Sequence, residues 1–280
     1  MTPAREEVWR SAPLGRDVGV AAWGHAGLPV LLFPTAGGDA REVERFGLVG
    51  ALAPLVEAGW IRLFSCDSVP GRALLQDDDL TPEAFAALLY RFDVFVYHEL
   101  VPWIRWQAGE PDGELVAAGA SLGALFALVS VCRHPDAFAH ALCLSGKYDL
   151  EDYFDGAAPP LDFHYASPLH FLPYLDDPDH LALLRRRFVR LICGQGRAEK
   201  PEYAFRVARV LGAKGIPNRV DAWGPDWHHD WASWRATLPI YLGELATGRR
   251  AKDPEPSGIP SPALGSAADR GAEPARPAEL

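Results

Sequence analysis

The chain has 280 residues, of which 49% are hydrophobic, so it can bury one large core or two small ones. Its formal net charge of -10 argues against nucleic acid or an anionic membrane as the main partner, because neither attracts an acidic surface. No apolar run is long enough to span a bilayer and the N-terminus lacks a signal-peptide core, so we expect a cytoplasmic protein. The four cysteines lie in apolar segments without Cys-x-x-Cys spacing, which favours buried, reduced thiols.

Apolar segments of strand length alternate with segments of helical periodicity over residues 17–248. The predicted strands are residues 17–23, 29–33, 61–66, 115–118, 140–145, 189–194 and 219–223, and the predicted helices are residues 41–58, 81–106, 122–133, 201–213 and 231–245. A glycine-containing turn separates the first two strands, which predicts a hairpin. The alternation indicates an α/β fold with a mainly parallel sheet and helices on both faces. Ligands of such sheets bind at the carboxyl ends of the strands.

Two segments depart from this alternation. Residues 151–185 read as an insertion that is rich in proline and aromatic residues, among them Tyr153 and Phe154. Such a segment forms part of a substrate pocket or lid, or else it packs on the body as a loop, and the sequence leaves both roles open. Residues 249–280 carry almost no large apolar side chain and cannot offset the entropy of ordering. We therefore predict one domain over residues 1–248 and a disordered tail.

The sequence Gly-Ala-Ser-Leu-Gly, residues 119–123, lies between an apolar strand and an apolar helix. In this setting a G-x-S-x-G turn raises a serine hydroxyl above the edge of the sheet, so Ser121 is the candidate nucleophile. Side chains at positions 119 or 123 would strike neighbouring backbone where the chain doubles back. The alternative is that Ser121 only caps the helix that begins at Leu122.

A serine hydroxyl becomes reactive when a base takes its proton, and that base is usually a histidine held by a carboxylate. His228 and His229 lie just before the last predicted helix, where a base is expected in the chain order Ser, acid, His. The acid candidates, in order of preference, are Glu199, Asp149 and Glu202. The alternative role for Glu199 is that of a solvated acid near a helix start.

Acyl transfer also needs donors for the oxyanion of the tetrahedral intermediate. One should be the backbone N–H of Leu122, which follows the candidate nucleophile. The second should come from the loop after residues 29–33, where we choose Ala36, because Gly37 and Gly38 let the backbone approach an ester carbonyl closely. The loop has no Gly-Lys-Ser/Thr sequence, so nucleotide binding is not expected. The sequence predicts neither a cofactor nor a metal.

Several segments resemble one protein family in the same order along the chain: GASLGALFAL, RHPDAF, LSGKYD, GQGRAEKPEY and HHDWASW. They are similar to the esterase D-like branch of the α/β-hydrolase superfamily, which includes S-formylglutathione hydrolases, feruloyl esterases and secreted mycolyltransferases. The closer resemblance is to uncharacterised bacterial esterases, and it covers residues 7–245. It implies an α/β-hydrolase fold, and we place the aromatic-rich insertion after the sixth strand of that fold. It also implies Ser121 as nucleophile, His229 as base and Glu199 as acid.

Some positions of this resemblance leave the substrate open. Asp67 matches an aspartate of the branch whose role is a substrate contact or, as we prefer, a loop cap. Pro225 stands where a histidine is frequent, and His228 stands where an asparagine often precedes the catalytic histidine. Gly37, Tyr153 and Phe154 are further candidates for contacts with the substrate.

The predicted activity is that of a serine esterase, which cleaves a small-molecule carboxylic ester through an acyl-enzyme on Ser121. One alternative is an acyltransferase that uses the same acyl-enzyme. Another is a catalytically silent hydrolase fold that binds a ligand or partner. The sequence defines neither the acyl nor the alcohol part of the substrate, and it leaves the oligomeric state open.

Overall fold

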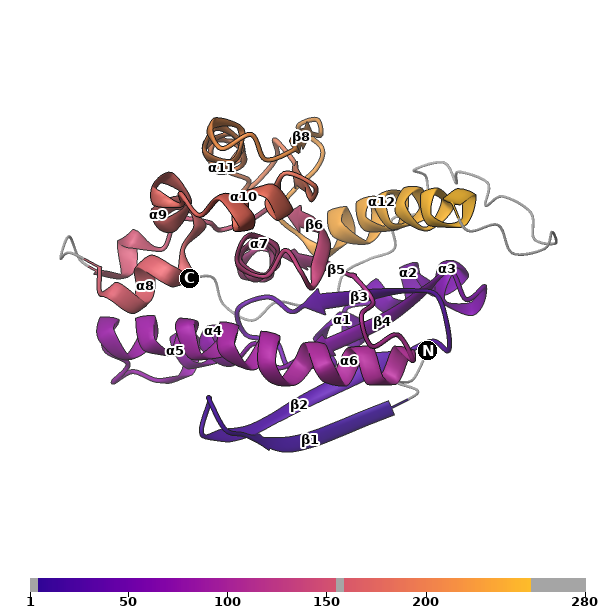
Figure 1. Ribbon diagram of the computed structural model, residues 1–280, viewed down its shortest axis with the longest axis horizontal. Helices are drawn as coiled ribbons and strands as arrows, with labels where there is room; N and C mark the ends of the chain where they lie inside the picture. The colour runs from indigo at the N-terminus through magenta and orange to yellow at the C-terminus, as the bar shows by residue number, and fades with distance from the viewer. Residues whose placement is uncertain (1–4, 155–158, 253–280) are drawn as a thin grey trace.

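The computed structural model describes residues 5–154 and 159–252, which are built around one eight-stranded sheet (Figure 1). The strand order is β1-β2-β4-β3-β5-β6-β7-β8. Neighbours from β4 to β8 are parallel, whereas β1 and β2 are antiparallel to each other and β2 is antiparallel to β4. The strands are β1 (Arg5–Ser11), β2 (Arg16–Trp23), β3 (Leu28–Phe33), β4 (Ile61–Cys66), β5 (Leu115–Ala120), β6 (Phe138–Leu144), β7 (Phe188–Cys193) and β8 (Asn218–Ala222). The predicted α/β fold with a mainly parallel sheet is confirmed.

The predicted hairpin between residues 17–23 and 29–33 is wrong, because β4 lies between β2 and β3. The loop before β3 packs on the end of β4: a Cβ atom at Gly27 would lie 2.4 Å from the carbonyl carbon of Trp60. Leu28 N then donates to Trp60 O over 2.9 Å, which starts β3 alongside β4. The hairpin partner of β2 is β1, an edge strand whose exposed, polar residues lack the apolar pattern of a buried strand.

Apolar side chains alternate between two cores, one on each face of the sheet. Val30 and Leu32 of β3 belong to one core, and Leu31 and Phe33 belong to the other. The first core is covered by α1 (Glu42–Arg45), α2 (Leu48–Ala51), α3 (Ala53–Glu57) and α12 (Trp231–Lys252). The second is covered by α5 (Pro82–Phe95), α6 (Val101–Ala108), α7 (Leu122–Arg133) and α11 (Pro201–Ala213). Helices therefore lie on both faces, as the sequence predicts.

Several helices differ from their predicted extents. Residues 41–58 form three short helices rather than one, and Gly47 interrupts them with φ 75°. Residues 81–106 form α5 and α6 joined by a π-helical turn, η1 (Val96–Leu100). This wider turn ends two residues before Pro102, which has no N–H to offer the preceding carbonyls. The helix α4 (Val69–Gln76) was not predicted, and α12 continues beyond residue 245 to Lys252.

Short helices make up the described part of the insertion between β6 and β7. They are η2 (Glu151–Phe154), α8 (Leu161–Ala166), α9 (Pro168–Phe171), η3 (Leu172–Tyr174) and α10 (Pro178–Leu184). Figure 1 shows α8 beside α5, at one end of the sheet. The ring of Tyr153 packs edge to face on Phe85 of α5 with centroids 5.7 Å apart, and Phe154 and Phe163 lie in the same core as α5, so aromatic contacts attach the insertion to the core. Residues 249–252, the first four of the predicted disordered tail, are helical at the end of α12, and residues 253–280 lie outside the described residues.

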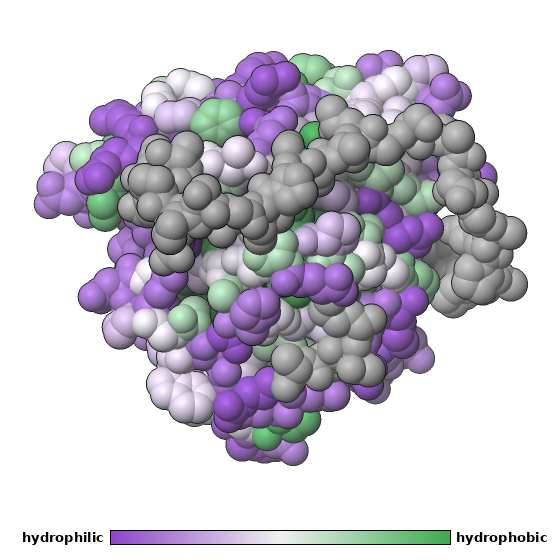
Figure 2. All heavy atoms as spheres, turned by 90° about the vertical axis from the view of Figure 1, so that its right-hand side faces the viewer, coloured by the Kyte–Doolittle hydropathy of each residue, from purple (hydrophilic) through white to green (hydrophobic). Residues whose placement is uncertain are grey.

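Hydrophilic residues predominate on the face in Figure 2, where smaller apolar groups are scattered among them. Within residues 5–154 and 159–252, no helix combines the length and apolar composition needed to cross a bilayer. All four cysteines are free and buried, as their apolar surroundings predict.

Candidate active site

Ser121 occupies a strained turn between β5 and α7. Its backbone angles, φ 56° and ψ -119°, lie in a region that residues with a side chain rarely adopt. The strand β6 and the loop that follows it hold this turn: Ser121 N donates to Leu144 O at 3.0 Å, and Lys147 N donates to Ser121 O at 3.1 Å. The Ser121 side chain makes no capping hydrogen bond to α7. The helix-cap alternative is therefore wrong, and the hydroxyl group is available for chemistry.

The two glycines of the motif allow close backbone contact on either side of Ser121. A Cβ atom at Gly119 would lie 2.4 Å from the carbonyl carbon of Gly123. A Cβ atom at Gly123 would lie 2.5 Å from the carbonyl oxygens of Phe33 and Pro34. The predicted steric purpose of both glycines is confirmed, and the second contact also joins the nucleophile turn to the loop after β3.

That loop carries Ala36, which lines the same cavity as Ser121 and Leu122. Leu122 is the first residue of α7, where a backbone N–H has no acceptor within the helix. No hydrogen bond from the amide of Leu122 or Ala36 to another described residue is present. The structure thus brings both predicted oxyanion donors to the candidate nucleophile, whereas Gly37 does not line the cavity.

A buried carboxylate fixes the shape of this loop. Glu42 accepts hydrogen bonds from Thr35 N and Thr35 Oγ1, both at 2.7 Å. Burial raises the pKa of Glu42, and the two bonds from Thr35 act in the opposite direction. On the far side, Gly71 packs against the loop so closely that a Cβ atom there would lie 2.2 Å from Ala36 O. The position of the Ala36 amide is therefore set by packing from α1 and α4.

His229 lines the cavity together with Ser121. Its backbone N–H donates to Arg197 O at 3.1 Å, and its ring packs edge to face on Trp234 with centroids 5.2 Å apart. Burial lowers the pKa of His229, with Asp230 acting in the opposite direction. The imidazole is therefore neutral at pH 7, which is the form that accepts a proton.

Glu199 is held by a partner other than His229. Its carboxylate accepts from Ser145 Oγ at 2.5 Å, and Trp234 Nε1 donates to the same hydroxyl at 2.9 Å. Burial raises the pKa of Glu199, while the Ser145 hydrogen bond lowers it. Among the described residues, no hydrogen bond joins His229 to a carboxylate. Trp234 contacts both the His229 ring and the hydroxyl group that binds Glu199.

The other predicted acids and His228 have separate roles. Asp149 forms an ion pair with Arg206 and accepts from the backbone N–H of Glu151 at 3.0 Å. Glu202 is exposed in the first turn of α11. His228 Nδ1 accepts from Arg197 N at 3.0 Å, which stabilises the loop that carries His229. None of these three side chains lines the cavity.

The remaining residues that were predicted to contact substrate also differ in whether they line the cavity. Asp67 accepts from Gly19 N at 2.9 Å and from Ala40 N at 3.0 Å, so it caps loops as we preferred. Tyr153 lines the cavity, which agrees with a substrate contact. Phe154 is only 2% exposed and belongs to the apolar core, so its predicted contact with substrate is wrong.

The cavity has a volume of about 570 Å³ and opens at the carboxyl ends of the strands. All three described non-glycine residues with positive φ, Ser121, Ser145 and Ala198, line it. The sequence analysis missed other lining residues: Leu74, Leu75, Lys147, Leu150, Lys200 and Tyr203. Lys147 and Lys200 follow β6 and β7. Their position shortly after a predicted strand is the sequence feature that could have identified them as lining residues.

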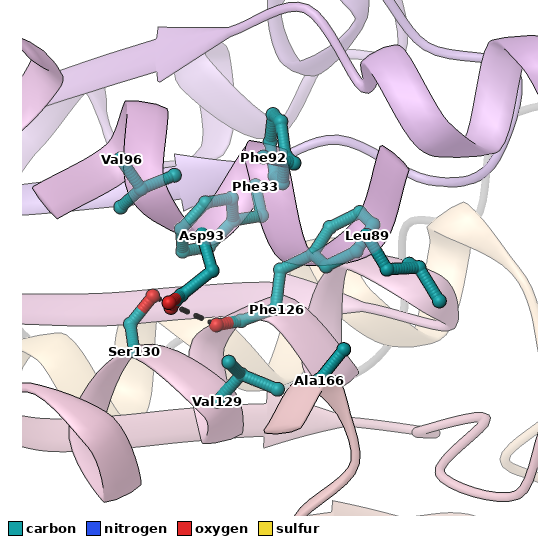
Figure 3. Close-up of a pocket in the computed structure, with 9 residues that line it drawn as sticks. All are labelled: Phe33, Leu89, Phe92, Asp93, Val96, Phe126, Val129, Ser130 and Ala166. Atoms are coloured by element: carbon teal, nitrogen blue, oxygen red, sulfur yellow. Dashed lines mark hydrogen bonds between the residues drawn. The ribbon is translucent and has the colours of Figure 1, made fainter. Parts of the chain in front are cut away.

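A second cavity, of about 10 Å³, lies among α5, α7 and α8 (Figure 3). Its two polar side chains are already engaged. Asp93 forms an ion pair with Arg133 at 2.8 Å and a hydrogen bond with His134 at 2.9 Å, and Ser130 Oγ donates to Phe126 O at 2.8 Å. This volume holds no more than one water molecule, so it is not a substrate site. In the part of the chain that the structure describes, no cluster of three or more His, Cys, Asp or Glu side chains could hold a metal ion.

Solved structures of hydrolases share this architecture. A ferulic acid esterase is 16% identical with a TM-score of 0.66, over 87% of this chain and 97% of that chain. An S-formylglutathione hydrolase from Agrobacterium tumefaciens is 12% identical with a TM-score of 0.64, over 86% and 94% of the two chains. FphF, a fluorophosphonate-binding serine hydrolase from Staphylococcus aureus, is 12% identical with a TM-score of 0.61, over 86% and 97%. At these identities the likeness shows the α/β-hydrolase fold.

Sequence comparison identifies the family. No curated protein matches the chain significantly. The family model described as "Putative esterase" matches residues 82–245, which is more than half of the chain and includes the nucleophile turn and the loop before α12. The chain therefore belongs to this esterase family of α/β-hydrolases.

Proposed function

We propose that the protein is a serine hydrolase that cleaves a carboxylic ester through an acyl-enzyme on Ser121. The observation that carries this proposal is the shared cavity of Ser121, His229 and the backbone of Leu122 and Ala36. The strained turn exposes the serine, and burial keeps the histidine neutral. Membership of the esterase family supports the choice of an ester as substrate.

In the proposed reaction, His229 takes the proton of the Ser121 hydroxyl as Oγ attacks the ester carbonyl carbon. The carbonyl π bond opens, and the amides of Leu122 and Ala36 donate to the resulting oxyanion. Collapse of this intermediate breaks the bond to the alcohol, which takes the proton from His229. Water then attacks the acyl-enzyme with His229 as base, releases the acid and restores the Ser121 hydroxyl.

Glu199 is the proposed acid of the triad. It follows β7, and its carboxylate is fixed by the Ser145 hydroxyl next to the tryptophan that contacts His229. A carboxylate there favours the imidazolium that forms during attack. Asp149 is less suited to this role because its charge is already paired with Arg206.

The test is the intact mass of the protein after exposure to a fluorophosphonate probe, with Ser121→Ala as the matched control. We expect one label on the wild-type chain and none on the variant, with both proteins folded by circular dichroism. A folded wild-type protein that takes no label would contradict the mechanism and favour a silent, ligand-binding fold. Product analysis of an ester reaction with an added alcohol then separates hydrolysis from acyl transfer.

A further inference from the structure

The loops that carry the proposed acid and the proposed base pack against each other. Glu199 belongs to the acid loop, residues 194–200, which follows β7. His229 belongs to the base loop, residues 223–230, which follows β8. The two strands are neighbours in the sheet and run parallel, so both loops begin beside each other at the carboxyl ends of the strands. The contacts between these loops determine how the acid and the base are placed.

Two glycines of the acid loop allow a close approach of the base loop. A Cβ atom at Gly194 would lie 2.0 Å from Trp227 O, and a Cβ atom at Gly196 would lie 2.0 Å from His228 Nδ1. Gly196 N also donates to Trp227 O at 2.9 Å. The glycines therefore leave room for the backbone of the base loop and for the His228 ring.

Arg197 of the acid loop binds both consecutive histidines of the base loop through its backbone. Its N–H donates to His228 Nδ1 at 3.0 Å, and its carbonyl oxygen accepts from His229 N at 3.1 Å. Arg197 lies two residues before Glu199 in the chain. These two hydrogen bonds therefore set the position of the proposed base relative to the loop that carries the proposed acid.

The direction of the bond to His228 fixes the protonation of its ring. A backbone N–H can only donate, so Nδ1 presents a lone pair and the proton of the neutral imidazole lies on Nε2. The backbone of His228 is held as well, because His228 N donates to Ser233 Oγ in the first turn of α12 at 2.9 Å. An acceptor atom bonded to Cγ thus meets Arg197 N from a fixed position.

Ala198 connects this contact to the proposed acid through a strained backbone. Its φ of 61° is unfavourable for a residue with a side chain. Such strain persists only where surrounding contacts determine the conformation. Arg197 is bound to the base loop on one side of Ala198, and Glu199 accepts from the Ser145 hydroxyl on the other side. Both sets of contacts therefore define the path of the acid loop.

We propose that His228 is a positioning residue of the triad: its neutral ring holds Arg197, and through Arg197 it sets the placement of Glu199 relative to His229. The proposal rests on the proposed esterase function and adds a residue that touches neither the substrate nor the reacting atoms. Small displacements of catalytic groups lower the rate of the chemical step. Because His228 does not line the cavity, its loss should lower kcat and leave KM near the wild-type value.

The experiment compares two amide side chains that differ in the position of the acceptor. His228→Asn places an acceptor oxygen on Cγ, as histidine does with Nδ1, whereas His228→Gln places it one bond further out. The assay measures 4-nitrophenyl acetate hydrolysis at pH 8, where histidine is ordinarily neutral. We expect kcat within about twofold of wild type for His228→Asn and about tenfold lower for His228→Gln, with KM unchanged in both.

His25→Gln is the matched control for the loss of a histidine. His25 is exposed in the loop before β3, at the amino ends of the parallel strands and therefore at the opposite end from the cavity. This variant should keep the wild-type kcat and KM. Circular dichroism should show that all three variants are folded.

NMR of isotopically labelled histidine rings gives a second readout that does not depend on turnover. The chain has nine histidines, and the ring signals that disappear in His228→Asn belong to His228. At pH 8 these signals should show an unprotonated Nδ1 and a protonated Nε2. A His228 ring with its proton on Nδ1 would overturn the proposal.

The outcomes separate this proposal from the esterase function. If the wild-type protein is labelled at Ser121 and turns over the ester, equal kcat values in His228→Asn and His228→Gln would overturn the positioning role alone. A similar loss in His25→Gln, or a change in KM without a change in kcat, would overturn it as well. A folded wild-type protein that shows neither labelling nor turnover would overturn the esterase function and, with it, the role of His228.

Discussion

The Ser145 hydroxyl group donates to the Glu199 carboxylate over 2.5 Å, and it holds the proposed acid from the end of the neighbouring strand. The same hydroxyl accepts from Trp234 Nε1 at 2.9 Å, which links the acid to α12. Ser145 adopts φ 47°, a conformation that a side chain makes unfavourable. Glycine would be less strained at this position. The hydrogen bond from the hydroxyl group to Glu199 explains why a serine is present instead.

Ser145→Ala and Ser145→Gly should each lower kcat/KM by about tenfold, because Glu199 loses its donor. The Ser145 hydrogen bond lowers the pKa of Glu199, so its removal should raise that pKa and add the ionisation of Glu199 to that of His229 in the acid limb of the pH profile. The glycine variant should be the more stable of the two, since glycine tolerates positive φ. A pH–rate profile that is unchanged in both variants would exclude the positioning role.

The acid limb of kcat/KM should have an apparent pKa below 6.5, the ordinary histidine value, because burial lowers the pKa of His229. Between the folded and unfolded pKa values, the unfolded chain binds more protons at this residue. His229 therefore contributes stability that is present above pH 6.5 and is lost as pH falls through that window.

Urea unfolding of wild type and His229→Gln at pH 7.5 and pH 5.5 measures this contribution. The wild-type free energy of unfolding should fall more on acidification than that of the variant. Equal falls would show that His229 does not have the lowered pKa. Glu42 and Glu199, whose pKa values are raised, are present in both proteins. Their contributions to the pH dependence of stability therefore cancel in the comparison.

Gly123→Ala should destabilise the protein by about 3 kcal/mol and abolish labelling of Ser121, because the new methyl group would meet the carbonyl oxygens of Phe33 and Pro34. Gly243→Ala in α12 is the matched control, since a Cβ atom there meets nothing within 4 Å. The control should gain roughly 0.5 to 1 kcal/mol from the lower flexibility of alanine. Chemical denaturation measures both changes, and similar effects would contradict the close contact at position 123.

Glu199→Gln should lower kcat/KM by roughly a thousandfold, because the neutral amide no longer favours the imidazolium. Asp149→Asn should leave kcat/KM near the wild-type value, since it removes only the pairing with Arg206. Steady-state kinetics of both variants on one ester gives the comparison. The reverse order of effects would assign the acid to Asp149.

The sequence predicted best where a local pattern determines the structure. The ranges 61–66, 122–133 and 201–213 match β4, α7 and α11 as the structure has them. The failures concern tertiary pairing: nothing in residues 17–33 shows that β4 separates β2 from β3. Three lining residues of the cavity were missed for the same reason, because Lys147, Lys200 and Tyr203 meet only when β6, β7 and α11 pack together.

The four buried cysteines give the molecule a chemical reporter of its own opening. Burial raises the pKa of Cys143 to about 12 and of Cys193 to about 11, and it raises those of Cys66 and Cys132 as well, so the thiolates that alkylating reagents attack are scarce in the native state. All four belong to the core beneath α5, α6 and α7, and none belongs to the core beneath α12. Cys193 also lines the cavity beside Ser121, so alkylation of Cys66, Cys132 and Cys143 is the specific reporter of exposure of this face of the sheet. Loosening of α12 alone should leave those three thiols unmodified.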